Sequence, residues 1–108
     1  MTNDGPHAPR TPAECKTIDQ LRECIDSIDL RLVQLLAERR GFVDAAAQFK
    51  NSADGVRAED RQRAMLVARR QWASDLGVDP ELVDELFRNM VRRFIDQELT
   101  RFETRSDT

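Results

Sequence analysis

Residues 18–49 read IDQLRECIDSIDLRLVQLLAERRGFVDAAAQF, and this stretch decides the fold. Its apolar residues recur at spacings of three and four, which is the pattern of one face of an α-helix. The series consists of Ile18, Leu21, Ile25, Ile28, Leu32, Leu35, Phe42, Ala46 and Phe49. Position 39 belongs to the same face, so the guanidinium of Arg39 interrupts an apolar seam. We predict one helix, roughly 50 Å long, that starts at a capping box of Thr17 and Gln20 and ends near Lys50.

Two shorter helices are predicted to follow. The first begins around Ala58 and ends at Leu76, where Gly77 provides a C-cap. Its expected apolar stripe consists of Met65, Ala68, Trp72 and Leu76. The second starts at Asp79, an N-cap residue followed by Pro80 at the first helical position. No segment has the alternating pattern of a β-strand, so we predict an all-α fold of three helices.

The apolar stripes also define the domain organisation. Residues 1–16 hold three prolines and no apolar periodicity, which predicts a disordered N-terminal tail that contains His7, the only histidine. Residues 17–103 form the expected helical domain, and residues 104–108 a short C-terminal tail. Two short helices cannot cover a seam roughly 50 Å long. We therefore predict an intertwined helical homodimer in which the long helices of two chains pack together.

Composition excludes several classes of protein. With 17 Lys and Arg against 20 Asp and Glu, the net charge is −3, so we expect no nucleic-acid or membrane partner. Cys15 and Cys24 are too few for a disulfide framework, and Cys24 is expected to be a small buried thiol. No histidine pair, phosphate loop or catalytic triad is present in the sequence, so we expect neither metal nor cofactor. The N-terminus has no apolar signal region, so a cytoplasmic location is expected.

Four charged residues interrupt or extend the apolar seams: Arg39, Lys50, Arg61 and Glu98. Arg39 and Lys50 are eleven positions apart, which places them about 20° apart around a helix and about 16 Å apart along it. Structural ion pairs, or long side chains with solvated heads, are one explanation. One carboxylate can neutralise only one of three cations, however, and the excess positive charge suits a dianionic small molecule.

The stretch RECIDSIDLRLVQLLAERRGFVDAAAQFK, residues 22–50, resembles the first helix of the all-helical (type II) chorismate mutases. It resembles equally the related isochorismate–pyruvate lyases of salicylate and siderophore biosynthesis. The shared features are Arg22, the segment IDSID, Arg39 seventeen positions later and Lys50 eleven further on. The resemblance continues through EDR at residues 59–61 and covers about residues 14–102.

This resemblance implies a site shared between two subunits. Arg39, Lys50 and Arg61 bind the substrate from one subunit, and Arg22 reaches into the site of the other. A distance of about 25 Å along the helix between Arg22 and Arg39 agrees with this division. Glu98 matches a Gln that hydrogen-bonds the ether oxygen in many members of the family. The expected catalytic residues are Lys50, Glu98 and Arg39, and the expected substrate-binding residues are Arg22, Arg39, Lys50, Arg61, Gln62, Phe94 and Glu98.

The sequence departs from the family pattern at Ala58 and Gln62, where some mutases carry acidic residues near the substrate hydroxyl. Our first prediction is a chorismate mutase that converts chorismate to prephenate by a concerted rearrangement, through conformational restraint and electrostatic stabilisation. The alternatives on the same scaffold are an isochorismate–pyruvate lyase and a mutase of an amino-substituted chorismate. An alternative of another class is a non-catalytic helical dimer module.

Overall fold

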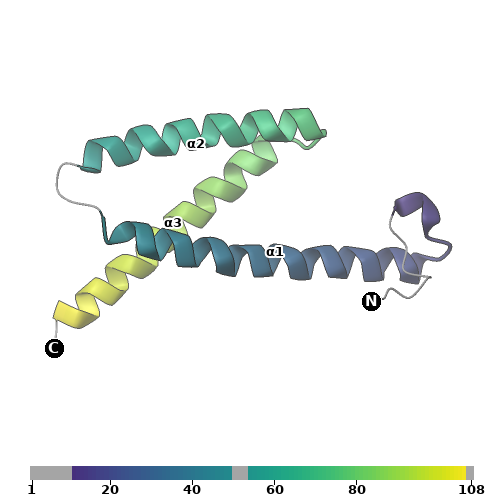
Figure 1. The fold of residues 1–108 in the computed structure, drawn as a ribbon, viewed down its shortest axis with the longest axis horizontal. Coiled ribbons are helices and arrows are strands. Elements are labelled where there is room, and N and C mark those ends of the chain that lie inside the picture. Colours follow the sequence, from purple (N-terminus) through teal and green to yellow (C-terminus); the bar gives the residue numbers. More distant parts are fainter. Residues whose placement is uncertain (1–10, 50–53, 107–108) are drawn as a thin grey trace. The chain divides into compact units, whose positions relative to one another are not determined.

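The computed structural model describes the backbone of residues 11–49 and 54–106 and the side chains of residues 11–49, 59–97 and 100 (Figure 1). The element order is a 3-10 helix, Pro12–Glu14, then α1, Ile18–Ala47, α2, Asp54–Leu76, and α3, Pro80–Ser106. Every regular element in these ranges is helical, which confirms the prediction of an all-α chain with three main helices. None of the described helices is long and apolar enough to cross a membrane.

The chain divides into two compact units, Met1–Lys50 and Asn51–Thr108. In the first unit, α1 begins where the capping signal predicted. The hydroxyl of Thr17 accepts a hydrogen bond from the backbone N–H of Gln20 at 3.1 Å. The side-chain oxygen of Gln20 accepts a hydrogen bond from the backbone N–H of Lys16 at 2.6 Å. In a standard capping box it would accept one from the N–H of the N-cap residue, here Thr17.

The far end of α1 comes slightly earlier than predicted. The helix ends at Ala47, and Gln48 and Phe49 continue as a turn. Lys50, at the predicted end of this helix, lies outside the described residues. The apolar seam is largely exposed: Ile25 is 54% and Phe42 is 73% exposed. Arg39, within that seam, is half-buried.

Three predicted boundaries differ from the structure. The second helix begins at Asp54, four residues before the expected start, and so includes Gly55. The third helix continues to Ser106, into the predicted C-terminal tail, since no Gly or Pro interrupts it. In the predicted N-terminal tail, the segment Pro12–Glu14 forms a 3-10 helix, while residues 1–10 lie outside the described part of the chain.

The turn between α2 and α3 forms as its sequence signals predict. Gly77 has a positive φ of 75°, a conformation that costs other residues a steric penalty. The N–H of Val78 bonds the carbonyl of Ala73 at 2.8 Å, and that of Gly77 bonds Ser74 at 3.2 Å, which together make a Schellman cap. Asp79 then accepts the N–H of Glu81 at 3.0 Å and starts α3.

The face of α2 that becomes buried agrees only in part with the predicted stripe, of which Met65 is buried. Trp72 and Leu76 are 53% and 79% exposed, whereas Leu66 and Ala73 are buried together with Met65. Leu66 and Ala73 are seven positions apart and therefore lie on one helical face, rotated from the predicted stripe. The small side chain of Ala73 suits a close approach by a neighbouring helix.

Candidate active site

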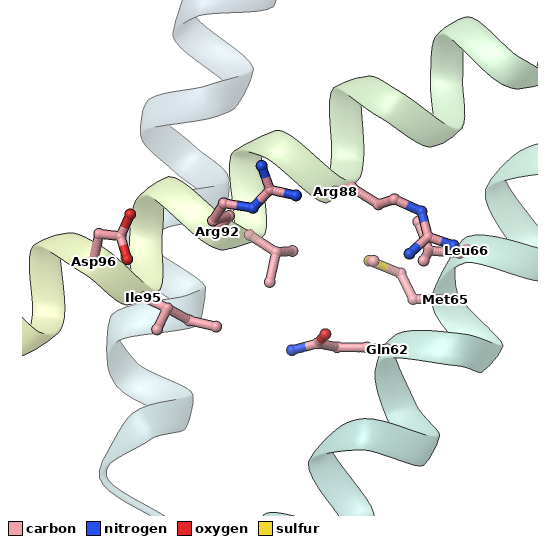
Figure 2. Close-up of a pocket in the computed structure, with 8 residues that line it drawn as sticks. Gln62, Met65, Leu66, Arg88, Arg92, Ile95 and Asp96 are labelled. Atoms are coloured by element: carbon pink, nitrogen blue, oxygen red, sulfur yellow. The ribbon is translucent and has the colours of Figure 1, made fainter.

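A groove of about 230 Å³ lies between α2 and α3 (Figure 2). Figure 2 shows Gln62 and Met65 extending from α2 into the space that α3 borders with Arg88, Arg92 and Ile95. The complete lining consists of Gln62, Met65, Leu66, Arg88, Val91, Arg92, Ile95 and Asp96. Two guanidinium groups, one carboxylate and a neutral amide thus surround four apolar side chains. Such a lining can hold an apolar ring and donate hydrogen bonds to an anionic group on it.

One side of this groove is held by a buried carboxylate. Asp84, on α3, is only 8% exposed. Its Oδ1 accepts a hydrogen bond from Nε of Arg88 at 2.5 Å, and its Oδ2 accepts one from Arg70 of α2 at 3.3 Å. Arg70 also binds Glu81 at 2.5 Å. These bonds join α2 to α3 and fix the side chain of Arg88, which lines the groove.

The charges in this network change the acidity of its carboxyl groups. The hydrogen bond from Arg88 lowers the pKa of Asp84 below its ordinary value of 3.8, although burial of the carboxyl works in the opposite direction. The hydrogen bond from Arg70 likewise lowers the pKa of Glu81. Both carboxylates are therefore ionised at neutral pH and neutralise the arginines that they contact.

A second contact joins α2 to α3 nearby. The guanidinium carbon of Arg69 lies 4.6 Å from the ring centroid of Trp72 and 5.5 Å from that of Phe87. Both distances are within the range of a cation–π interaction. Arg69 and Trp72 belong to α2 and Phe87 to α3, so this stack also stabilises the pairing of the two helices.

The structure places the predicted site residues in both units. Gln62 lines the groove, Arg61 is its exposed neighbour, and Phe94 is half-buried on α3. Arg39 lies in the middle of α1 and Arg22 near its start, exposed and 3.9 Å from Asp19. The side chains of Lys50 and Glu98 lie outside the described residues. Among the predicted site residues whose side chains the structure describes, Gln62 alone lines the α2–α3 groove.

Sequence reasoning missed Asp84, Arg88 and Arg92. Asp84 stands in the apolar stripe of α3, seven positions before Val91, and is thus on nearly the same helical face. The argument that singled out Glu98, a charge on an apolar stripe, applies equally to Asp84 and could have found it. Arg88 and Arg92 lie at the edge of that stripe, where a long cationic side chain carries no distinctive signal.

Among the side chains that the structure describes, no three His, Cys, Asp or Glu residues come close enough together to hold a metal ion. The groups available in the groove are guanidinium, amide and carboxylate groups. These groups can bind, orient and stabilise charge by hydrogen bonding.

Comparison with known proteins defines the family. Residues 21–99 match the family described as chorismate mutase type II. An isochorismate pyruvate lyase from Pseudomonas aeruginosa is 38% identical over 90 residues, which cover 83% of this chain and 89% of that protein. This chain therefore belongs to the chorismate mutase type II family, and these matches identify it as an enzyme.

Two further relatives are much longer than this chain. A T-protein from Enterobacter agglomerans is 36% identical over 73 residues, which are 67% of this chain and 20% of the relative. A T-protein from Haemophilus influenzae is 33% identical over 78 residues, which are 71% of this chain and 21% of the relative. The chain thus spans about a fifth of each T-protein.

Proposed function

We propose that this chain catalyses a concerted reaction of a cyclic dicarboxylate that carries an enolpyruvyl ether, and that this reaction is the cleavage of isochorismate to salicylate and pyruvate. The observation that carries this choice is the isochorismate pyruvate lyase from Pseudomonas aeruginosa, which aligns over 89% of its length. The T-proteins align over only about a fifth of theirs. Similarity over a whole small protein is better support for a shared reaction than similarity to one part of a larger one.

The residue at position 62 supports the same choice. Some mutases of the family carry acidic residues at the positions of Ala58 and Gln62, near the substrate hydroxyl. Gln62 lines the α2–α3 groove, where its amide can donate and accept hydrogen bonds but carries no charge. Isochorismate carries its hydroxyl on a different ring carbon from chorismate, so the loss of the acidic contact agrees with isochorismate as the substrate.

The roles of the site residues follow from the charges of this substrate. Arg39 and Arg22 of the partner subunit bind the two carboxylates, and Arg61 completes the anion site. Lys50 and a protonated Glu98 donate hydrogen bonds to the ether oxygen, where negative charge builds as its bond to the ring breaks. Gln62 and Phe94 contact the ring. Catalysis then consists of conformational restraint and charge stabilisation.

The proposed site requires an intertwined homodimer, and the exposed seam of α1 supports one. Ile25, Leu32 and Phe42 are 54%, 54% and 73% exposed on a helix of 30 residues. A contiguous apolar stripe of this length is typical of a surface that another chain covers. In this arrangement the catalytic domain spans residues 17–103, and each site receives Arg22 from the second chain.

A chorismate mutase that forms prephenate is the second candidate. The family that matches residues 21–99 is described by that activity. Both reactions break the same ether bond and require the same hydrogen-bond donors. The two candidates therefore differ at the ring end of the site, where Gln62 lies, and not at the carboxylate end.

Identifying the reaction products distinguishes the lyase from the mutase. The purified protein is incubated with isochorismate and with chorismate in separate reactions, and salicylate, pyruvate and prephenate are quantified by chromatography. We expect salicylate and pyruvate in equal amounts from isochorismate. Arg39→Ala, purified in the same way, controls for enzymes of the expression host. Prephenate from chorismate without salicylate from isochorismate selects the mutase, and no product from either substrate contradicts both proposals.

Lys50→Ala tests the remaining alternative, a non-catalytic helical dimer. If Lys50 binds substrate, its truncation abolishes turnover but leaves far-UV circular dichroism and the sedimentation coefficient of the ligand-free protein unchanged. Loss of helicity or of the dimer would instead assign Lys50 a structural role. Measuring all three properties on one preparation makes the two outcomes distinguishable.

A further inference from the structure

The two cysteines of the chain lie next to each other in space. Cys15 follows the 3-10 helix Pro12–Glu14, and Cys24 lies in the second turn of α1. Their Sγ atoms are 4.0 Å apart, and both residues are half-buried. Nine positions separate them in sequence, so the chain must turn back on α1 to bring the two thiols together.

Local hydrogen bonds hold this turn in place. The backbone N–H of Thr11 bonds a carboxylate oxygen of Glu14 at 2.8 Å, and the N–H of Glu14 bonds the carbonyl of Thr11 at 3.0 Å. The N–H of Cys15 bonds the carbonyl of Pro12 at 3.1 Å. The N–H of Lys16 bonds the side chain of Gln20 at 2.6 Å. Cys15 is therefore fixed within the 3-10 turn on one side, and on the other side its neighbour Lys16 is bonded to α1.

The thiols face a small cavity of about 300 Å³ in the same unit. The apolar part of its wall consists of Leu21, Ile25 and Ile28 of α1 and Pro12 of the 3-10 helix. Burial raises the pKa of the Cys15 thiol, and its hydrogen bond with Cys24 raises it further. Cys15 is thus protonated at neutral pH.

We propose that Cys15 and Cys24 form a reversible thiol–disulfide site that reacts with low-molecular-mass disulfides. A disulfide bond requires the two sulfurs, which are 4.0 Å apart, to approach by about 2 Å. One thiol, as its thiolate, attacks the small disulfide, forms a mixed disulfide and releases one small thiol. The second cysteine then attacks the mixed disulfide and releases the second small thiol, each departing thiolate taking up one cysteine proton.

The Cys15–Cys24 disulfide fixes the N-terminal end of α1. A Cys15–Cys24 bond closes a loop that contains Thr17, the N-cap, and Arg22. Closing this loop restricts the fraying that helix ends undergo. An effect on catalysis through Arg22 rests on the proposed function, whereas formation of the bond does not depend on it.

Trypsin makes the bond directly detectable, because Lys16 and Arg22 both lie between the cysteines. The folded protein is equilibrated with oxidised and reduced glutathione, quenched with acid, alkylated and digested without reduction. We expect the peptide of residues 11–16 to be linked to that of residues 23–31, with a total mass lower by two hydrogens than the separate peptides. Dithiothreitol should release both peptides.

Two controls test whether the disulfide forms because the fold holds the two thiols together. Cys15→Ser, which keeps one thiol, should carry only glutathione on Cys24. In concentrated urea the wild-type chain should form the linked peptides with an equilibrium constant roughly tenfold lower, because the thiols are no longer held together. An equal constant in the folded and unfolded chains, glutathione on both cysteines, or a disulfide between two chains would each overturn the proposal.

Discussion

Leu66→Ala tests how α2 and α3 are held together. Leu66 is 8% exposed and is buried with Met65, which is 6% exposed. Replacing a buried Leu by Ala costs about 2–5 kcal/mol, and the cost increases with the volume of the cavity that remains. Because Leu66 lines an open groove, solvent can fill the space that it leaves, so we expect a loss near the lower end of this range.

Leu76→Ala is the matched control. It removes the same atoms from the same helix, but Leu76 is 79% exposed, so we expect a loss below about 0.5 kcal/mol. Urea unfolding, followed by far-UV circular dichroism at two protein concentrations, measures both variants and separates dimer dissociation from unfolding of the chain. Equal losses for the two variants, or a larger loss for Leu76→Ala, would refute the assignment of the buried face of α2.

Three further predictions concern charged residues. The pKa of Asp84 is lower in the folded chain than its ordinary 3.8, so its carboxylate stabilises the fold above that pH and this contribution is lost as the pH falls below it. The difference in urea midpoint between wild type and Asp84→Asn should therefore be largest near neutrality and should shrink as the pH falls through 3.8. Arg22→Ala and Arg39→Ala should each be inactive, yet refolding them together should restore roughly a quarter of the sites, since each heterodimer holds one intact site. Wild-type turnover should decline as rising pH ionises Glu98, and Glu98→Gln should flatten that decline because an amide remains a donor.

Each of these predictions has an outcome that contradicts it. A midpoint difference for Asp84→Asn that does not change with pH would mean that the carboxylate is not stabilised by its arginines. No recovered activity, despite subunit exchange confirmed by mass spectrometry of tagged chains, would exclude a shared site. Identical alkaline limbs for wild type and Glu98→Gln would show that Glu98 is not the titrating donor.

The sequence by itself determined the number of helices and the caps at which α1 and α3 begin and α2 ends. Thr17 caps α1, Gly77 takes the positive φ that ends α2, and Asp79 starts α3, each as its local pattern predicted. These features are readable because each cap is made by hydrogen bonds between residues within five positions of one another. The family, too, was readable from the resemblance of residues 22–50 to the type II chorismate mutases, and the match over residues 21–99 confirms it.

The tertiary structure alone decided which helix face is covered and which charges meet. The sequence predicted a single stripe on α2, and the structure buries Leu66 and Ala73, which lie outside that stripe, together with Met65. Asp84 and Arg70 are fourteen positions apart and come together only because α3 folds back along α2. Helical periodicity fixes the direction of a side chain around its own axis, but the rotation of one helix against another depends on the packing of both surfaces. For that reason the sequence analysis did not predict the hydrogen-bond network of Asp84, although the sequence contains both of its arginines and both of its carboxylates.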